Sequence, residues 1–448
     1  MFKKVLIANR GEIAVRVIRA CRELGLKTVA VFSTADRSAL HAKIADEAVC
    51  IGGAATKDSY LNEKAIIAAC EITGADAIHP GFGFLSENAA FARNCSKCGI
   101  NFIGPAPESI EMLGDKAAAK AAMKAAGVPV IPGSDGAVKT MEEAVRLAKE
   151  EIGFPLMVKA SAGGGGRGIR LVERIEDLEA QVTAAKQEAL NFFGDDSIYM
   201  EKFIVNPKHI EFQILADKHG NCVHLGERDC SMQRRNQKVL EETPSVIMTP
   251  DLRERMGRAA VAAAKVCGYY NAGTIEFLVD ADNNFYFMEM NTRIQVEHPI
   301  TENVTGIDLV KMQMKIAAGE ELPFKQEDIS LRGHSIECRI NAESPEFNFR
   351  PCPGKINSLH IPGGPGIRID SSAYQGYTIT PYYDSMIAKL IVHAPTREEA
   401  IMKMKWALAE FIVEGVDTNI DFQLELIRDP AFEAGNYDIG YLGRKMKL

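Results

Sequence analysis

The segment KASAGGGGRGIR, residues Lys159–Arg170, distinguishes between several kinds of nucleotide-binding fold. Gly163-x-Gly165-x-x-Gly168 satisfies the pattern of a dinucleotide-binding turn, but that turn must open a helix and GIRLV begins as a β-like run. A P-loop ends in Gly-Lys-Ser/Thr, which Gly166-Arg167-Gly168 lacks. The run therefore predicts a hairpin loop between two strands, whose backbone N–H groups close over phosphates with Lys159 as their charged anchor. The alternative, a surface turn without a ligand, leaves the entropy cost of four glycines unexplained.

The composition is that of an ordinary globular protein and excludes several functional classes. The chain has 448 residues, enough for two to four domains, and 46% are hydrophobic. A net charge of -8 argues against general binding to nucleic acid or a membrane surface. The apolar run VLIA near the N-terminus is too short for a signal peptide or a membrane span, which favours the cytoplasm. Ten scattered cysteines indicate reduced thiols, and Cys95-x-x-Cys98 lacks the second pair of a zinc site.

The distribution of element signals predicts three domains and a linker. Alternating strand and helix patterns over 1–114 indicate an open, largely parallel sheet with covering helices, as in a Rossmann-like domain. Residues 115–130 form an Ala-rich helical linker, and 131–204 form a small α+β unit that contains the glycine run. Residues 205–448 contain hairpin-like segments of an antiparallel layer and end in a capped helix that begins after Thr396. The fold class is therefore α/β combined with α+β.

The segment TIEFLVDADNNFYFMEMN predicts a metal site. If Asp282 and Asn283 form a tight turn, Glu276 and Glu289 lie directly opposite each other on neighbouring strands. Two carboxylates in that position repel each other, and the apolar residues beside them argue against an exposed acidic edge. A divalent cation removes the repulsion, and Mg²⁺ bound by carboxylates and nucleotide phosphates suits such a pair.

The residues that follow predict an anion site beside that metal. In an extended chain, alternate side chains share one face. From Glu289 onward that face holds Asn291, Arg293, Gln295 and Glu297. The series offers metal ligands, a cation, an amide and a carboxylate, which suits a small oxyanion held next to a metal-bound phosphate. Glu297 is the best-placed general base in this arrangement.

Other basic residues are candidates for phosphate contacts, although spacing alone does not choose among them. Lys116, Lys120 and Lys124 form an i,i+4 stripe, whose last two members fit a solvated helix face. Five more basic residues lie where two strand-rich segments meet, namely Lys202, His209, Arg234, Arg235 and Lys238. The tripeptide Met402-Lys403-Met404 imitates a biotin attachment site, but it lies within a predicted amphipathic helix rather than at a hairpin tip. We therefore expect the chain not to carry its own biotin.

These motifs resemble the biotin carboxylases, the ATP-grasp components of biotin-dependent carboxylases such as acetyl-CoA carboxylase. The resemblance covers essentially the whole chain. It rests on LIANRGEIAVRVIRA, HPGFGFLSEN, KASAGGGGRGIR, GERDCSMQRRNQKVLEE, GTIEF, MEMNTRIQVEHPITE, ECRINAE and PYYDSMIAKLIV. It implies an ATP-grasp fold with an N-terminal Rossmann-like domain, a glycine-rich lid and a C-terminal antiparallel-sheet domain that holds the metals.

The resemblance also implies roles for individual residues. The residues expected at the nucleotide are Lys116, Lys159, His209 and Gln233 at the phosphates and ribose, the lid glycines Gly163, Gly164, Gly165 and Gly166, and Glu201, Lys202, Ile204 and Leu278 at the adenine. Glu276, Glu289 and Asn291 would bind Mg²⁺, or Mn²⁺ in its place. Bicarbonate would be held by Lys238, Arg293, Gln295 and the Val296 backbone, with Glu297 as base, and Arg339 would stabilise the biotin enolate.

The implied reaction is the ATP-dependent carboxylation of biotin with bicarbonate through carboxyphosphate. The implied partners are a separate biotin carboxyl carrier protein and carboxyltransferase subunits, with a homodimer as the expected assembly. Two positions depart from the family pattern. Asn236 replaces a common histidine at the nucleotide, and Phe82 replaces a frequent tyrosine near biotin, so a polar contact is lost there.

Three other functions remain open at this stage. Another ATP-grasp ligase would share the lid and metal carboxylates but would not need the series from Arg293 to Glu297. A nucleotide-binding regulatory subunit would not need intact acid, base and metal residues. A dinucleotide oxidoreductase has only the fold signals in its favour.

Overall fold

The computed structural model describes residues 2–160, 169–193 and 196–446. The predicted phosphate contacts of Gly163, Gly164, Gly165 and Gly166 therefore lie outside the described residues. Contacts divide the chain into two compact units. The larger contains residues 1–128, 208–277 and 289–448, and the smaller contains 129–207 and 278–288.

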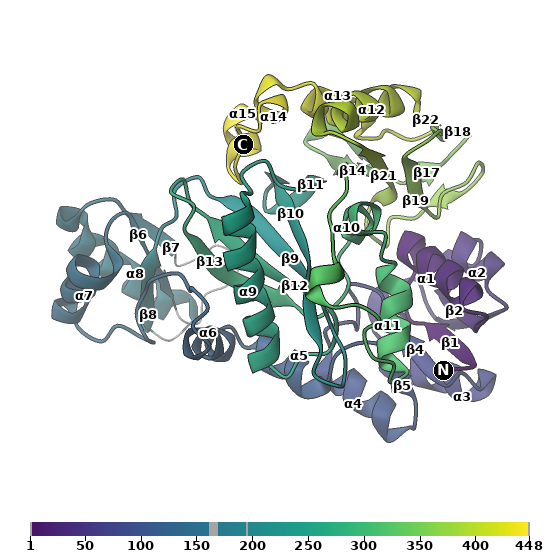
Figure 1. The fold of residues 1–448 in the computed structure, drawn as a ribbon, viewed down its shortest axis with the longest axis horizontal. Helices are drawn as coiled ribbons and strands as arrows, with labels where there is room; N and C mark the ends of the chain where they lie inside the picture. The colour runs from purple at the N-terminus through teal and green to yellow at the C-terminus, as the bar shows by residue number, and fades with distance from the viewer. Residues whose placement is uncertain (1, 161–168, 194–195, 447–448) are drawn as a thin grey trace. The chain divides into compact units, whose positions relative to one another are not determined.

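The larger unit begins with a five-stranded sheet in the order β3-β2-β1-β4-β5, and all of its strand pairs are parallel. Its strands are β1 (Lys4–Ile7), β2 (Lys27–Ser33), β3 (Glu47–Gly52), β4 (Ala77–His79) and β5 (Asn101–Phe102). Its helices are α1 (Gly11–Glu23), α2 (Leu40–Ile44), α3 (Glu63–Thr73), α4 (Ala89–Lys97), α5 (Pro107–Gly114) and α6 (Lys116–Ala125) (Figure 1). The predicted open parallel sheet is confirmed.

Local sequence explains the burial of the central strand β1, the end of α1 and the start of α6. Val5, Leu6 and Ile7 are fully buried, as expected of a central strand with both faces covered. Gly25 adopts a φ of 72° after α1, a left-handed conformation that releases the chain into β2. The Asp115 carboxylate accepts hydrogen bonds from the N–H groups of Ala117 and Ala118 and so caps α6.

A second sheet has eight strands in the order β13-β12-β9-β10-β11-β14-β21-β19. Its strands are β9 (Lys208–Ala216), β10 (Cys222–Arg234), β11 (Gln237–Thr243), β12 (Asn271–Val279), β13 (Phe285–Asn291), β14 (His334–Asn341), β19 (Ile367–Ser371) and β21 (Met386–Ala394). Short strands complete this part of the chain, namely β15 (Glu343–Ser344), β16 (Arg350–Pro351), β17 (Gly354–Lys355), β18 (Ser358–His360), β20 (Thr378–Ile379) and β22 (Ile412–Glu414).

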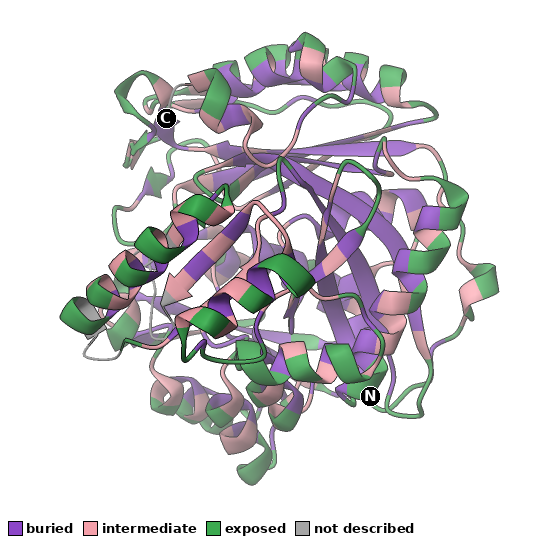
Figure 2. Cartoon of the chain, turned by 90° about the vertical axis from the view of Figure 1, so that its left-hand side faces the viewer, coloured by how far each residue is buried: buried purple, intermediate pink, exposed green. Residues whose placement is uncertain are grey.

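Helices cover this second sheet and bury its apolar side chains. They are α9 (Pro250–Val266), α10 (His298–Thr305), α11 (Leu309–Ala317), α12 (Arg397–Glu410), α13 (Ile420–Ile427), α14 (Pro430–Glu433) and α15 (Tyr441–Met446). Figure 2 shows the C-terminal helices exposed on their outer side and buried toward the strands beneath them. One core joins Ile336, Leu390 and Val392 of the sheet to Met404 and Leu408 of α12.

The C-terminal part of the chain differs from its prediction. Thr396 caps α12 by accepting a hydrogen bond from the Glu399 N–H at 3.2 Å, as its spacing predicts. The chain does not end in this helix, however, because Ile412–Glu414 pairs with Ser358–His360 and three further helices follow. The β-branched Ile412 and Val413 favour that strand. Lys403 lies within α12 and donates to the Pro365 and His393 carbonyls, which differs from an exposed hairpin tip.

The smaller unit is an antiparallel sheet in the order β7-β6-β8 with two helices. Its elements are α7 (Met141–Leu147), β6 (Leu156–Ala160), β7 (Ile169–Val172), α8 (Ile175–Phe193) and β8 (Ile198–Lys202). Leu156, Val158, Leu178 and Met200 form part of its separate core. The sequence-based order of helix, strand, strand, helix and strand is confirmed.

No helix among the described residues is both long and apolar enough to cross a bilayer. All ten cysteines are free thiols. Cys95 is buried on α4 and Cys98 is exposed at its end.

The buried Glu242 on β11 anchors the C-terminal helices. Its carboxylate accepts hydrogen bonds from Tyr437, from Arg397 at 2.7 Å and from His334 at 2.7 Å. Burial alone would raise its pKa, but His334 and Arg397 outweigh that effect and lower the pKa to about 2. A carboxylate with a lowered pKa stabilises the fold above its unfolded pKa of about 4.5, and this contribution is lost as the pH falls toward 2.

We expect Glu242→Gln to lower the free energy of unfolding by about 3 kcal/mol at pH 7, because the folded protein lowers the Glu242 pKa to about 2. The difference between the unfolding free energies of wild type and Glu242→Gln should be smaller by about 1 kcal/mol at pH 4 than at pH 7. Urea unfolding at both pH values measures it, with the exposed Glu410→Gln as the control. A gap that stays constant with pH would contradict the role assigned to Glu242.

Candidate active site

The ammonium group of Lys238 lies among three carboxylates in the larger unit. Its Nζ is 2.6 Å from Glu211 Oε2, 2.9 Å from Glu276 Oε1 and 2.7 Å from Glu297 Oε1. The three glutamates are buried, and they come from β9, β12 and the residue that precedes α10. A group of like charges persists in the interior only where cations neutralise it, so Lys238 holds this cluster together.

Strand periodicity places these groups on one face of the second sheet. Along β9, His209, Glu211 and Gln213 alternate with the buried apolar residues Ile210 and Phe212. Across the β10–β11 hairpin, Gln233 is the register partner of Lys238. Polar side chains from successive strands therefore converge on one side of the sheet.

The charges around Lys238 control the protonation of the cluster. Burial would lower the pKa of Lys238, but the three carboxylates outweigh it and hold that pKa well above its usual value. Burial would likewise raise the pKa of Glu297, whereas Lys238, Arg339 and Arg228 lower it far below the usual range. At neutral pH, Lys238 is an ammonium and Glu297 is a carboxylate.

Arg339 on β14 contacts the other side of Glu297. Its guanidinium donates to Glu241 Oε1 at 2.6 Å and to Glu297 Oε2 at 3.0 Å. Burial raises the pKa of Glu241 to about 7, against the opposing effect of Arg339. Glu297 thus has a cation at each of its oxygens.

Glu276 is the second point of convergence. Its Oε1 accepts hydrogen bonds from Asn291 Nδ2 at 2.9 Å and Gln295 Nε2 at 3.1 Å, and its Oε2 is 3.1 Å from His209 Nε2. Gln233 Nε2 is 2.8 Å from His209 Nδ1. The structure therefore brings together most of the predicted phosphate, metal and bicarbonate residues of this unit.

The negative charge of Glu276 also affects the pKa of Glu289. Burial raises the pKa of Glu289, and the Glu276 charge raises it further while Lys116 lowers it. The predicted electrostatic conflict between the two glutamates is therefore present. The turn between their strands is wider than predicted, because the Asp280 N–H donates to the Asn284 carbonyl and the strands end at Val279 and begin at Phe285.

The prediction of an extended strand from Glu289 to Glu297 holds only as far as Asn291 and is wrong for the residues after it. Strand β13 ends at Asn291, and Glu297 already occupies the position that precedes α10, where Pro299 favours the start of a helix. The side chains meet despite this, because the Arg293 guanidinium donates to Gln295 Oε1 at 2.8 Å and to Asn291 Oδ1 at 3.0 Å. A turn rather than a strand brings them together.

Sequence reasoning missed several charged residues of the cluster. Glu211 contacts Lys238 and the fully buried Arg228, whose Nε lies 2.5 Å from Glu211 Oε1. Glu87 accepts from Arg293 Nε at 2.9 Å, and Glu241 pairs with Arg339. Alternation of polar residues in HIEFQ was a usable signal for Glu211, whereas nothing local marks Glu87.

Two groups of side chains in the described residues have metal-ligand spacing. One is His209, Glu211 and Glu276, and the other is Glu211, Cys230 and Glu297. Burial raises the pKa of Cys230 well above its usual value, so its thiol stays protonated and is a poor ligand. Only the first group combines with the oxygen donors Glu289 and Asn291, and that donor set suits a hard cation such as Mg²⁺.

The predicted adenine residues lie in the smaller unit. Lys159 on β6 pairs with Glu201 on β8, and the Lys202 N–H donates to the Pro132 carbonyl at 2.8 Å. Ile204 is buried and Leu278 is partly buried. Ile204 and Leu278 therefore offer apolar side chains in this unit.

One of the two departures from the family pattern, Asn236, has a structural explanation, and nothing in the structure explains Phe82. Arg235 and Asn236 form the two-residue turn between β10 and β11, with φ values of 50° and 62°. Asn suits such a turn because it tolerates the left-handed conformation. Phe82 is partly buried against the core of the N-terminal sheet, and its carbonyl accepts a hydrogen bond from Asn9.

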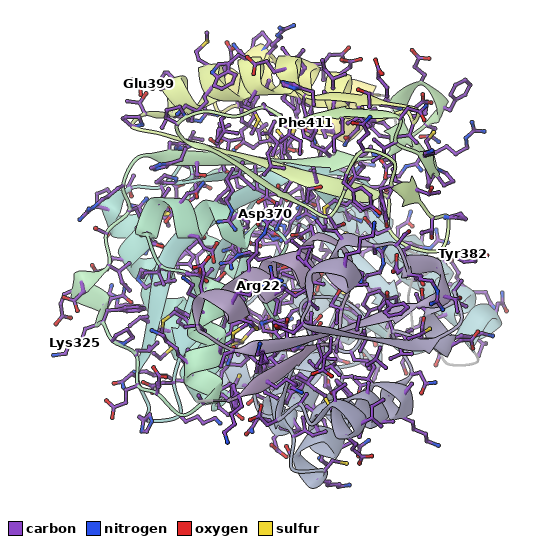
Figure 3. The ribbon with its side chains drawn as sticks, turned by 90° about the vertical axis from the view of Figure 1, so that its right-hand side faces the viewer. Arg22, Lys325, Asp370, Tyr382, Glu399 and Phe411 are labelled. Atoms are coloured by element: carbon purple, nitrogen blue, oxygen red, sulfur yellow. The ribbon has the colours of Figure 1, made fainter. Side chains whose placement is uncertain are left out.

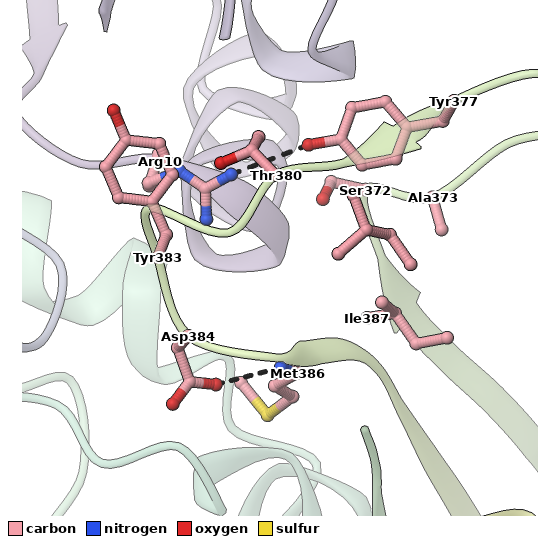
Figure 4. A pocket seen from close by; sticks show the side chains of 10 residues that line it. Arg10, Ser372, Ala373, Tyr377, Thr380, Tyr383, Asp384, Met386 and Ile387 are labelled. Atoms are coloured by element: carbon pink, nitrogen blue, oxygen red, sulfur yellow. Dashed lines mark hydrogen bonds between the residues drawn. The ribbon is translucent and has the colours of Figure 1, made fainter. Parts of the chain in front are cut away.

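A small cavity lies elsewhere in the larger unit, beside Arg10, Tyr377 and Tyr383 (Figure 4). Its volume of about 20 Å³ holds little more than a water molecule. The Arg10 guanidinium lies 4.2 Å from the centre of the Tyr383 ring and pairs with Asp36. The site described above, rather than this cavity, has the groups for chemistry.

Comparisons with known proteins agree with these features. Three family models match: the biotin carboxylase N-terminal domain over residues 1–110, the ATP-binding domain of the carbamoyl-phosphate synthase L chain over 115–325, and the biotin carboxylase C-terminal domain over 337–444. Biotin carboxylase 1 of Bacillus subtilis is 56% identical over 99% of this chain and 98% of its own. Biotin carboxylase of Haemophilus influenzae is 55% identical over the full length of both chains.

Solved structures agree as well. The biotin carboxylase domain dimer of Hydrogenobacter thermophilus 2-oxoglutarate carboxylase, in complex with MgADP, ADP and bicarbonate, is 54% identical over 100% of this chain and 98% of that one, with a TM-score of 0.89. Biotin carboxylase of Campylobacter jejuni, a β,γ-ATP complex, is 53% identical over 99% of both chains, with a TM-score of 0.90. The chain therefore belongs to the biotin carboxylase family, as its motifs indicate.

Proposed function

We propose that this protein carboxylates biotin with bicarbonate at the expense of ATP, giving carboxybiotin, ADP and phosphate. Family membership over the whole chain supports the reaction class. The observation that carries the proposal is the buried Glu297 carboxylate, which has Lys238 at one oxygen and Arg339 at the other. This arrangement provides one base and two cations for a reaction between anions.

We assign the nucleotide and metal contacts as follows. Lys116, Lys159, His209 and Gln233 bind the phosphates and ribose, while Glu201, Lys202, Ile204 and Leu278 bind the adenine. Glu276, Glu289 and Asn291 hold Mg²⁺, which neutralises the phosphate charge when bound. The raised pKa of Glu289 supports this assignment, because burial and the neighbouring Glu276 disfavour its charge until a cation is present.

We assign bicarbonate to Lys238, Arg293, Gln295 and the Val296 backbone. Deprotonated bicarbonate attacks the γ-phosphate and gives carboxyphosphate, which breaks down to CO₂ and phosphate. The phosphate takes the ureido proton of biotin, and Arg339 stabilises the resulting biotin enolate. The deprotonated ureido nitrogen of biotin then attacks CO₂. Exclusion of water protects carboxyphosphate from hydrolysis.

The geometry of the free protein explains how Glu297 acts as a base. Its pKa is held low while Lys238 and Arg339 are its partners. When Lys238 turns to bicarbonate and Arg339 to biotin, the carboxylate loses stabilisation and its proton affinity rises. The basicity of Glu297 therefore rises when bicarbonate binds and rises further when biotin binds.

We further propose that biotin is presented on a separate carrier protein and that a carboxyltransferase takes up the product. The homodimer proposed for this chain is supported by the dimer of the Hydrogenobacter thermophilus domain. Acetyl-CoA carboxylase in fatty acid biosynthesis, in the cytoplasm, is the proposed setting. Relatives from 2-oxoglutarate and pyruvate carboxylases make those acceptors the alternatives, and co-purification of the carboxyltransferase subunit distinguishes them.

We expect ATP hydrolysis to require bicarbonate and to accelerate with free biotin. Bicarbonate labelled with ¹⁸O should transfer one label to each phosphate released, because the attacking oxygen stays with phosphorus. Mass spectrometry of the phosphate measures this transfer. Unlabelled phosphate would rule out carboxyphosphate, and hydrolysis that depends on an amino acid instead would favour another ATP-grasp ligase.

We expect Glu297→Gln to reduce biotin-dependent turnover by about 10²- to 10⁴-fold, the usual range for a lost general base. Binding of ATP, measured by calorimetry, should change little. The matched control is Glu343→Gln, which alters a buried carboxylate that accepts from Ser385 and Asn341. Equal losses in the two variants would contradict the role of Glu297.

We expect Lys159→Ala to raise the KM for ATP at least about tenfold, because a charge-assisted phosphate contact is worth roughly 1.5–3 kcal/mol. The exposed Lys149→Ala in the same unit serves as the control. Unchanged ATP kinetics in Lys159→Ala would remove its role as the phosphate anchor.

A further inference from the structure

Two buried side chains that have no assigned role so far bind backbone carbonyls of the turn that contains Gln295, Val296 and Glu297. The first is His298, whose ring Nδ1 lies 2.8 Å from the Gln295 carbonyl oxygen. A carbonyl oxygen can only accept, so Nδ1 carries the proton. His298 is fully buried, and burial together with the nearby Lys389, Arg16 and Arg368 charges lowers its pKa well below the usual value. The ring is therefore a neutral donor.

The Gln295 carbonyl belongs to the same peptide group as the Val296 N–H. In a trans peptide the carbonyl and the N–H point in opposite directions, so a donor that fixes the carbonyl also directs the N–H. The hydrogen bond also withdraws electron density from the peptide and strengthens its N–H as a donor. His298 thus controls the backbone group that we assign to bicarbonate.

The second side chain is Lys389 on β21, which is completely buried. Its Nζ donates to the Val296 carbonyl at 2.8 Å and lies 3.2 Å from Glu12 Oε1 and 3.8 Å from Asp370 Oδ2. Asp370 lies in the interior between the C-terminal strands and α1 (Figure 3). Two carboxylates thus neutralise Lys389, and its remaining donor fixes the peptide group that leads into Glu297.

Sheet register places Lys389 next to Arg339, which contacts Glu297. Lys389 on β21 is the direct partner of Arg339 on β14, so their side chains emerge on the same face of the sheet. Arg339 donates to the carboxylate of Glu297, and Lys389 donates to the carbonyl of the residue before it. Two neighbouring cations of the sheet therefore hold two consecutive residues of the turn.

We propose that His298 and Lys389 are positioning residues, which hold the peptide groups on either side of Val296 so that its N–H and the Glu297 carboxylate face bicarbonate. This assignment rests on the proposed function. In this arrangement the Gln295 carbonyl is held by the first residue of α10 and the Val296 carbonyl by a lysine of the sheet. Neither residue touches the reacting atoms.

The expected effect is selective for bicarbonate. His298→Leu should raise the KM for bicarbonate about tenfold and leave the KM for ATP within about twofold, because one directed hydrogen bond is lost. His298→Asn should restore most of the affinity, since its amide nitrogen can take the place of Nδ1. Steady-state ATP hydrolysis with varied bicarbonate measures both constants. His41→Leu, at an equally buried histidine on α2, is the control.

Lys389→Met provides a second test. On its own it leaves Glu12 and Asp370 without their shared cation, which destabilises the fold. The double variant Glu12→Gln with Lys389→Met removes part of that excess charge, and Glu12→Gln alone retains the Val296 contact. Circular dichroism identifies the folded variants. The double variant should show the raised bicarbonate KM, and Glu12→Gln should not.

Two results would overturn the assignment. One is an unchanged bicarbonate KM in folded His298→Leu and in the folded double variant. The other is an equal rise of both constants, without rescue by His298→Asn. Wild-type protein that hydrolyses ATP without any bicarbonate requirement would overturn the proposed function itself, and the positioning role with it.

Discussion

The ion cluster centred on Lys238 is the constraint on which the rest of the structure depends. Glu211, Glu276 and Glu297 approach its ammonium from separate parts of the sequence, and Arg228 and Arg339 complete the charge balance. Loss of one partner would leave an uncompensated charge in the interior, which costs several kcal/mol. The strands that carry these groups must therefore keep their register, and the eight-stranded sheet is the frame that fixes it.

The same cluster bears on how a chain with a net charge of -8 would bind the anionic substrates proposed for it. Its cations are already paired with internal carboxylates before any substrate arrives. At the site proposed for them, bicarbonate and the phosphates of ATP would exchange for these carboxylates rather than enter an excess of positive charge. Such an exchange keeps the net electrostatic gain of binding small and couples binding to the basicity of Glu297.

The sequence predicted most of the fold because its signals are local. The βα alternation, the helix caps and the strand periodicity each need only a short window. Glu276, Asn291, Gln295 and Glu297 were found for a similar reason, since they lie close together in one segment. Glu87 and Glu211 were missed because their roles arise from partners 206 and 27 residues away. The turn after Asn291 was missed because alternation of polar residues does not distinguish a strand from the approach to a helix.

That turn also determines how the polar side chains of the segment MNTRIQVEHP are arranged. A continuing strand would direct Asn291, Arg293, Gln295 and Glu297 along a line with about 7 Å between successive side chains of one face. The turn instead draws Gln295 to Glu276, whereas Glu297 reaches Lys238 and Arg339. Side chains from one short segment therefore surround a small volume rather than line an edge. A small anion such as bicarbonate needs donors on several sides, and a flat strand cannot provide them. The bonds from His298 and Lys389 to the outer carbonyls are the structural means by which the chain keeps this curvature.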